Sequence, residues 1–126
     1  MSDKKLTIAV DFDGTLCEYA FPEIGEQRRS HKILMSKLIQ LRNEGHKLIL
    51  WTNRGDNDEY PVLTEAVDWC RNRGLIFDAV NENIPNQKKL SGYSQKVMAD
   101  IYIDDRALEF NETNSMERTL NYLNNI

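Results

Sequence analysis

Residues 6–15 of the chain read LTIAVDFDGT, and their pattern decides how the rest of the sequence is interpreted. The first five of these residues are almost wholly apolar, which is typical of a strand buried on both faces of a parallel sheet. Two carboxylates, Asp11 and Asp13, follow directly, and Gly14 allows another part of the backbone to approach closely. The stretch therefore predicts a buried strand that ends in a pair of acidic side chains.

Similar apolar runs recur along the chain and alternate with helical periodicity. Residues 30–44 carry apolar side chains at helical spacing, with Ser30 as a candidate N-cap and Gly45 as a stop signal. The remaining predicted elements are strands at 48–51, 77–80 and 99–104 and helices at 59–73 and 115–123. Strands that alternate with helices imply right-handed crossovers and a three-layer α/β fold with a parallel sheet.

The length and composition are those of one globular domain. The 126 residues include 16 Lys and Arg against 20 Asp and Glu, a formal net charge of −4. A single domain over residues 1–126 is expected at this length. The acidic balance argues against non-specific nucleic-acid binding, which requires a basic surface. A nucleotide or a single phosphate ester stays open as a substrate.

Three features predict a cytoplasmic protein with no membrane partner. The chain has two cysteines, too few for a disulfide framework, so reduced thiols are expected. The apolar run near the N-terminus ends at Asp11 and is too short for a secretion signal. No apolar run reaches the roughly 18–20 residues that span a bilayer.

Polar side chains follow three of the predicted strands at the point where each strand ends. They are Asp11 and Asp13 after the first strand, Thr52, Asn53 and Arg54 after the second, and Asp104, Asp105 and Arg106 after the fourth. Ligands of an open parallel sheet bind beyond the carboxyl ends of its strands, so these groups are expected at one edge. Four carboxylates gathered there would repel one another unless a cation neutralised them, and oxygen ligands of this kind favour Mg²⁺. Each group alone is typical of a turn, a loop or a helix cap; their occurrence together favours a site.

Three segments together resemble the motifs of the haloacid dehalogenase superfamily of phosphotransferases. Residues 11–16 (DFDGTL) look like its first motif, 50–54 (LWTNR) like its second and 101–105 (IYIDD) like its acidic fourth. The resemblance covers most of the chain, from Leu6 to Arg106. It implies a Rossmann-like core and Mg²⁺-dependent phosphoryl transfer through an aspartyl-phosphate intermediate.

The resemblance also implies roles for the two acids of the first motif. Asp11 would be the nucleophile and a metal ligand, because its carboxylate can attack phosphorus once a cation reduces the repulsion. Asp13 would protonate the leaving oxygen and then activate water, and its main-chain carbonyl would bind Mg²⁺. An acid at position 13 favours phosphate esters over carbon–halogen bonds, since the dehalogenase members of the family lack it.

The other two motifs supply further ligands by the same resemblance. Thr52 would hydrogen-bond a phosphoryl oxygen, and Asn53 would belong to the same phosphate-binding group. Asp104 would complete the metal shell, and Asp105 would act either as a direct ligand or through a water molecule.

The lysine of the third motif and the roles of two arginines stay open. Lys96 is favoured over the pair Lys88 and Lys89, because it precedes the last strand closely enough to reach the same edge. Any of the three is alternatively a solvated surface lysine. Arg54 and Arg106 either read a second anionic group of the substrate or pair with a neighbouring carboxylate.

No segment is long enough for the cap domain that members of this family usually carry. Residues 16–29 and 81–98 are each too short to fold independently. A capless enzyme is therefore expected, and residues 17–29, bent at Pro22 and Gly25, form either a short flap or a loop with no substrate role. An open site admits bulky substrates or is covered by a second copy of the chain in a homo-oligomer. The resemblance to short capless phosphatases implies a small phosphate ester, namely a sugar phosphate, a nucleotide or a polysaccharide precursor.

Other interpretations are less favoured by the residues. A phosphorylated receiver module has similar groups, but its acidic pair, phosphorylated Asp, Thr and Lys follow a different order. A non-catalytic binding or regulatory relative stays open, although every chemical group is retained. A phosphotransferase or phosphomutase is possible in mechanism, but phosphomutases resemble capped members. His31 and His46 show no ligand spacing and are expected to face solvent.

Overall fold

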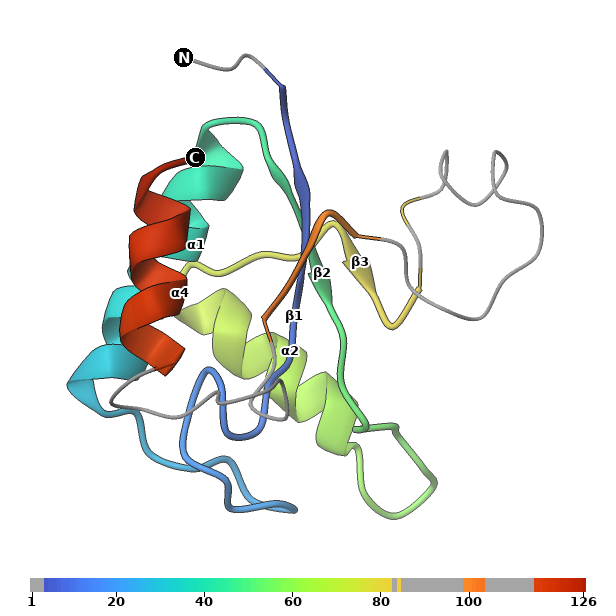
Figure 1. Ribbon diagram of the computed structural model, residues 1–126. Helices are drawn as coiled ribbons and strands as arrows, with labels where there is room; N and C mark the ends of the chain where they lie inside the picture. The colour runs from blue at the N-terminus through green and yellow to red at the C-terminus, as the bar shows by residue number, and fades with distance from the viewer. Residues whose placement is uncertain (1–3, 83, 85–98, 104–114) are drawn as a thin grey trace.

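The computed structural model describes residues 4–82, 84, 99–103 and 115–126. Figure 1 shows a sheet with helices packed beside it. The strands are β1 (Thr7–Val10), β2 (Lys47–Leu50), β3 (Ala79–Val80) and β4 (Ile101–Ile103), and the helices are α1 (Arg29–Asn43), α2 (Val62–Asn72) and α4 (Ser115–Asn124). Each of these elements was predicted from the sequence, with bounds that differ by a few residues.

The four strands form one parallel sheet in the order β3-β2-β1-β4. Val10, the last residue of β1, lies beside both Leu50 and Ile103, the last residues of β2 and β4. Three strands therefore end together at the carboxyl edge of the sheet. The fold is α/β and Rossmann-like, and the described residues contain no cap domain.

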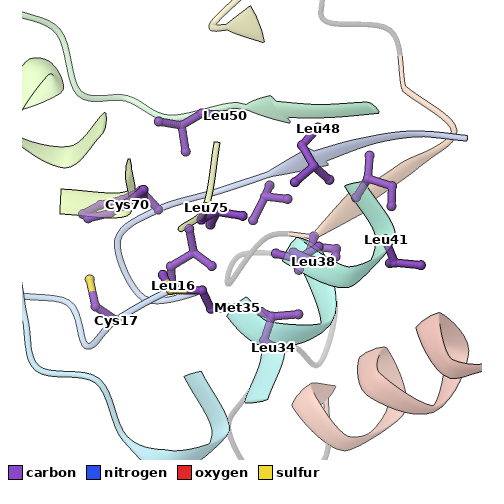
Figure 2. Packing of buried hydrophobic residues seen from close by; sticks show 14 of the residues in the cluster. Leu16, Cys17, Leu34, Met35, Leu38, Leu41, Leu48, Leu50, Cys70 and Leu75 are labelled. Carbon is purple, nitrogen blue, oxygen red and sulfur yellow. The ribbon is translucent and has the colours of Figure 1, made fainter. Parts of the chain in front are cut away.

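Side chains alternate strictly between the two faces of the sheet. Ile8, Val10, Leu48, Leu50 and Ile103 point to one face, where they pack with buried residues of all three described helices, among them Leu34, Leu38, Leu41, Ala66, Cys70 and Leu123. Figure 2 shows part of this cluster, with Leu48 and Leu50 of the sheet near Leu38 and Leu41 of α1. Ala9, Ile49 and Ala79 form a smaller cluster on the other face. The third layer of the predicted architecture would cover that smaller cluster. The three described helices all pack on the first face, and most of the segment between β3 and β4 lies outside the described residues.

Both histidines are buried, so the prediction that they face solvent is wrong. His31 and His46 are 5% and 6% exposed. The Nδ1 atom of His31 accepts the N–H of Arg28 at 2.9 Å, which makes Arg28 the N-cap of α1 in place of the predicted Ser30. Nδ1 of His46 accepts the N–H of Leu6 at 3.0 Å. Each ring satisfies a main-chain donor that would otherwise lack a partner.

No helix in the part of the chain that the structure describes is long and apolar enough to cross a membrane.

The stability of the fold should depend on the protonation of His46. Burial lowers the pKa of His46 from its ordinary value of 6.5, and the charge of Lys5 acts in the same direction. The unfolded chain then binds more protons below pH 6.5, so the stabilisation is fully present above that pH and is lost as the pH falls through the lower folded value. Protonation also removes the acceptor for Leu6. We expect the free energy of unfolding, measured by denaturant titration, to fall from about pH 7 to about pH 5.

The variant His46→Asn is the control, because its side-chain oxygen keeps an acceptor that does not titrate. In this variant the fall over the same range should be smaller. An equal fall in both proteins would assign the pH dependence to other groups.

Candidate functional site

The carboxyl edge of the sheet brings together residues from two of the predicted motifs. The N–H of Asp11 donates to the carbonyl of Ile103 at 2.8 Å, and the N–H of Trp51 donates to the carbonyl of Val10 at 2.8 Å. The segments that leave β1 and β2 therefore begin side by side, next to the end of β4. Asp13 and Thr52 follow within two residues of these bonds.

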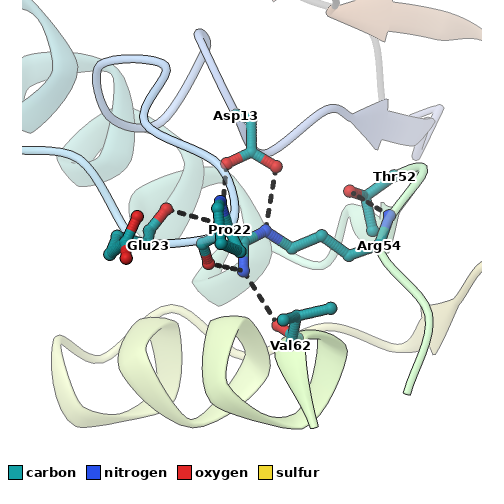
Figure 3. A network of polar contacts seen from close by, with 6 residues as sticks. All are labelled: Asp13, Pro22, Glu23, Thr52, Arg54 and Val62. Carbon is teal, nitrogen blue, oxygen red and sulfur yellow. Dashed lines mark hydrogen bonds and ion pairs between the residues drawn. The ribbon is translucent and has the colours of Figure 1, made fainter. Parts of the chain in front are cut away.

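Asp13 and Arg54 form a two-bond ion pair across 41 positions of sequence. Nε of Arg54 donates to Oδ2 of Asp13 and Nη2 donates to Oδ1, both at 2.8 Å (Figure 3). The side chain of Arg54 is 1% exposed and that of Asp13 is 11% exposed. Two hydrogen bonds from one guanidinium to both oxygens of one carboxylate are the strong form of such a pair.

Main-chain carbonyls and aromatic rings surround the rest of the Arg54 guanidinium. Its N–H groups donate to the carbonyls of Pro22 at 3.3 Å, Glu23 at 2.9 Å and Val62 at 3.0 Å. Its central carbon lies 5.0 Å from the ring centre of Phe12 and 5.1 Å from that of Phe21. Burial alone lowers the pKa of Arg54, but the hydrogen bonds and negative charge of Asp13 outweigh burial and raise it.

These contacts decide between the two alternatives that the sequence left open for Arg54. The side chain pairs with a neighbouring carboxylate and is buried, so it does not present its charge to a substrate anion. The other residues proposed from the sequence for this edge lie outside the described residues; they are Lys88, Lys89, Lys96, Asp104, Asp105 and Arg106.

Asn81, which belongs to none of the three sequence motifs, fixes the loop that carries Thr52. Its Oδ1 accepts the N–H of Thr52 at 2.8 Å, and its Nδ2 donates to the carbonyl of Arg54 at 3.4 Å. The Thr52 hydroxyl oxygen in turn accepts the N–H of Arg54 at 3.2 Å, while Asn53 is exposed. Asn81 has φ of 53°, a left-handed conformation that asparagine tolerates better than most residues. An asparagine directly after a predicted strand was the available signal.

The flap (residues 17–29) is closed on itself at its base. The N–H of Glu18 donates to the carbonyl of Glu26 at 2.8 Å. Gly25 packs so tightly against this base that an added Cβ would lie 2.0 Å from the carbonyl oxygen of Glu18. Burial raises the pKa of the Cys17 thiol to about 11, so this cysteine is an inert packing group. Within the flap, Tyr19 and Phe21 expose 64% and 46% of their surface.

The oxygen atoms at this edge are of the kind that binds a hard cation, although the described residues contain no complete metal site. No group of three or more His, Cys, Asp or Glu side chains gathers anywhere in residues 4–82, 84, 99–103 and 115–126. Both oxygens of Asp13 accept from Arg54, and its main-chain carbonyl is a further oxygen donor at this edge. Asp11 contributes a carboxylate beside the end of β4. These donors fit Mg²⁺, which is bound by one or two carboxylates with several waters.

Comparison with known proteins finds one solved structure that matches along almost the whole chain. It is the structure of a conserved protein from Bacteroides thetaiotaomicron, with 38% sequence identity and a TM-score of 0.73. The match covers 94% of this chain and 93% of that chain. No family model matches the chain, and no curated protein matches it significantly.

Removal of the Asn81 side chain should loosen the loop that carries Thr52 and Arg54. In Asn81→Ala the half-buried N–H of Thr52 loses its acceptor. Alanine also adopts the left-handed conformation of position 81 less readily than asparagine does. Together these changes should lower the free energy of unfolding by about 2 kcal/mol. Denaturant titration measures the change.

The control is Asn81→Asp, which keeps an acceptor for Thr52 and tolerates the same backbone conformation. It loses only the longer hydrogen bond to the carbonyl of Arg54, so we expect a loss of about 1 kcal/mol, clearly smaller than in Asn81→Ala. Equal losses in the two variants would show that the acceptor at position 81 does not hold the loop.

Proposed function

We propose that this chain, which belongs to the same family as the conserved Bacteroides thetaiotaomicron protein, is a capless Mg²⁺-dependent phosphatase of the haloacid dehalogenase superfamily. It would hydrolyse a phosphate monoester through an aspartyl-phosphate on Asp11. The observation that carries the proposal is the juxtaposition of Asp11, Asp13 and Thr52 at the carboxyl edge of a parallel sheet. These are the chemical groups that the first two motifs would supply, and they come from neighbouring strands.

The reaction would proceed in two displacements at phosphorus. In the first, a carboxylate oxygen of Asp11 forms a bond to phosphorus while the ester P–O bond breaks, and the leaving oxygen takes a proton from Asp13. In the second, water attacks the phosphorus, its proton passes to Asp13, and the bond to Asp11 breaks to release phosphate. Asp13 thus begins and ends the cycle in the same protonation state.

Thr52 would stabilise the phosphoryl group during both displacements. Its hydroxyl oxygen accepts the N–H of Arg54, which leaves the hydroxyl hydrogen available to donate to a phosphoryl oxygen. Asn53 would contribute from the exposed position next to it. Lys96, or in its place Lys88 or Lys89, would offset further negative charge.

Mg²⁺ would be held by Asp11, the main-chain carbonyl of Asp13, Asp104 and, either directly or through a water molecule, Asp105. Asp104 directly follows Ile103 in the sequence. The carbonyl of Ile103 accepts the N–H of Asp11, so the residue before Asp104 lies next to the proposed nucleophile. The bound cation would reduce the repulsion between the Asp11 carboxylate and an anionic ester.

The substrate would be a small phosphate ester such as a sugar phosphate, a nucleotide or a polysaccharide precursor. The flap contacts Arg54, the partner of Asp13, through the carbonyls of Pro22 and Glu23. Its half-exposed ring of Phe21, which lies over Arg54, would contact the organic part of such a molecule. A second copy of the chain would be the natural cover for the open side. A cytoplasmic location agrees with Cys17 and Cys70, which are both free thiols.

Asp11→Asn should abolish phosphate release, because an amide does not attack phosphorus. With Mg²⁺ and a panel of sugar phosphates and nucleotides, released phosphate should fall by at least about a thousandfold. Circular dichroism should show an unchanged fold, since the substitution keeps the size of the side chain.

Asp68→Asn is the matched control, because Asp68 is an exposed acid on α2 that pairs with Arg71; it should keep full activity. Chelation of Mg²⁺ should abolish turnover in the original protein. Turnover that survives in Asp11→Asn, after repurification, would remove Asp11 from the role of nucleophile.

A further inference from the structure

The guanidinium of Arg54 has no donor left for a substrate. An arginine side chain carries five N–H groups. Here they meet five acceptor oxygens, namely two of Asp13 and the carbonyls of Pro22, Glu23 and Val62. The rings of Phe12 and Phe21 lie near the guanidinium at 5.0 and 5.1 Å. Arg54 is therefore part of the protein framework and acts on the reaction only through the groups that it holds.

Asp13 lies between this framework and the open side of the site. Its side chain is 11% exposed, whereas that of Arg54 is 1% exposed. Each carboxylate oxygen has two acceptor positions, and Arg54 uses one on each oxygen. The other positions remain for a proton, so Asp13 can exchange a proton with a reactant while both of its oxygens stay anchored.

We propose that Arg54 is a positioning residue that holds Asp13 at the angle needed to protonate the leaving oxygen, which suits the site to alkyl phosphates such as sugar phosphates. This inference rests on the proposed phosphatase function. A planar fork fixes both the position and the plane of a carboxylate, and a lysine, with one compact ammonium group, does not. An alkyl leaving group departs as an unstable alkoxide unless it is protonated, whereas p-nitrophenolate departs without help. In the first displacement, which kcat/KM reports, the fixed acid therefore matters for alkyl esters and not for p-nitrophenyl phosphate.

The same fork ties the flap to Asp13. The carbonyls of Pro22 and Glu23 belong to the flap, and the carbonyl of Val62 belongs to the first turn of α2 (Figure 3). The acid and the wall of the site beside it are consequently held by one side chain. Without a cap domain, this arrangement would hold Asp13 and the flap in the fixed geometry that catalysis requires.

The test compares two esters in each variant of Arg54. The value of kcat/KM includes only the steps up to departure of the leaving group, so it reports on protonation of that group. For Arg54→Lys we expect kcat/KM to fall by about 100-fold with glycerol phosphate and by less than about fivefold with p-nitrophenyl phosphate. The ratio of the two values does not depend on how much of the preparation is folded. Arg54→Gln, which lacks both the charge and the fork, serves as a second variant with the same expectation.

Arg42→Lys is the matched control. Arg42 forms a partly buried ion pair with Asp78 at 3.2 Å, and Asp78 binds the N–H of Leu48 near the opposite edge of the sheet. Its substitution should leave both values of kcat/KM unchanged. A ratio that changes as much in Arg42→Lys as in Arg54→Lys would overturn the inference.

Asp13→Asn separates the inference from the proposed function. Selective loss of the alkyl ester in Asp13→Asn but equal losses of both esters in Arg54→Lys and Arg54→Gln would overturn the positioning role and leave the phosphatase proposal intact. Equal losses in Asp13→Asn would overturn the acid role of Asp13 itself. If the original protein hydrolysed neither ester, the proposed function would fail.

Discussion

The positive charge of Arg54, buried almost completely behind the carboxyl edge of the sheet, constrains the structure around it. An ionised side chain in the interior is costly unless every polar atom finds a partner. The chain meets this demand with one carboxylate and three carbonyl groups that come from the turn after β1, from the flap and from the start of α2. All three segments are therefore positioned by the need to supply acceptors to Arg54. Among these acceptors, the side chain of Asp13 is 11% exposed and so reaches solvent.

The parallel sheet supplies the second condition for the site. Because Val10, Leu50 and Ile103 lie side by side, the segments that follow them leave the sheet at one edge. Asn81 then fixes the loop after β2 from its position after β3. The placement of Thr52 and Arg54 thus depends on all three strands on that side of the sheet, while Asp11 depends on β1 and β4.

Sequence patterns predicted the elements and the edge, because both follow from local rules. Apolar runs and helical spacing indicated each strand and helix, and the parallel topology placed Asp11 and Thr52 together without any knowledge of contacts. From the sequence, Arg54 was expected either to bind a second anionic group of the substrate or to pair with a neighbouring carboxylate. Asp13 and Arg54 are 41 positions apart, and a local sequence pattern does not indicate which distant donor and acceptor form a hydrogen bond. The prediction for His31 and His46 was wrong for the same reason. Each ring accepts a hydrogen bond from a main-chain N–H group that comes close to it only in the folded chain.

The most direct measurement is a crystal structure of the protein with Mg²⁺ and beryllofluoride, which mimics a phosphoryl group bonded to a carboxylate. We expect beryllium to bind an oxygen of Asp11, the Thr52 hydroxyl to donate to a fluoride, and both hydrogen bonds between Arg54 and Asp13 to remain. Beryllofluoride bound to another residue would contradict the assignment of Asp11 as the phosphoryl acceptor. An Asp13 carboxylate turned away from Arg54 in the same complex would contradict the view that this buried pair holds the acid in place.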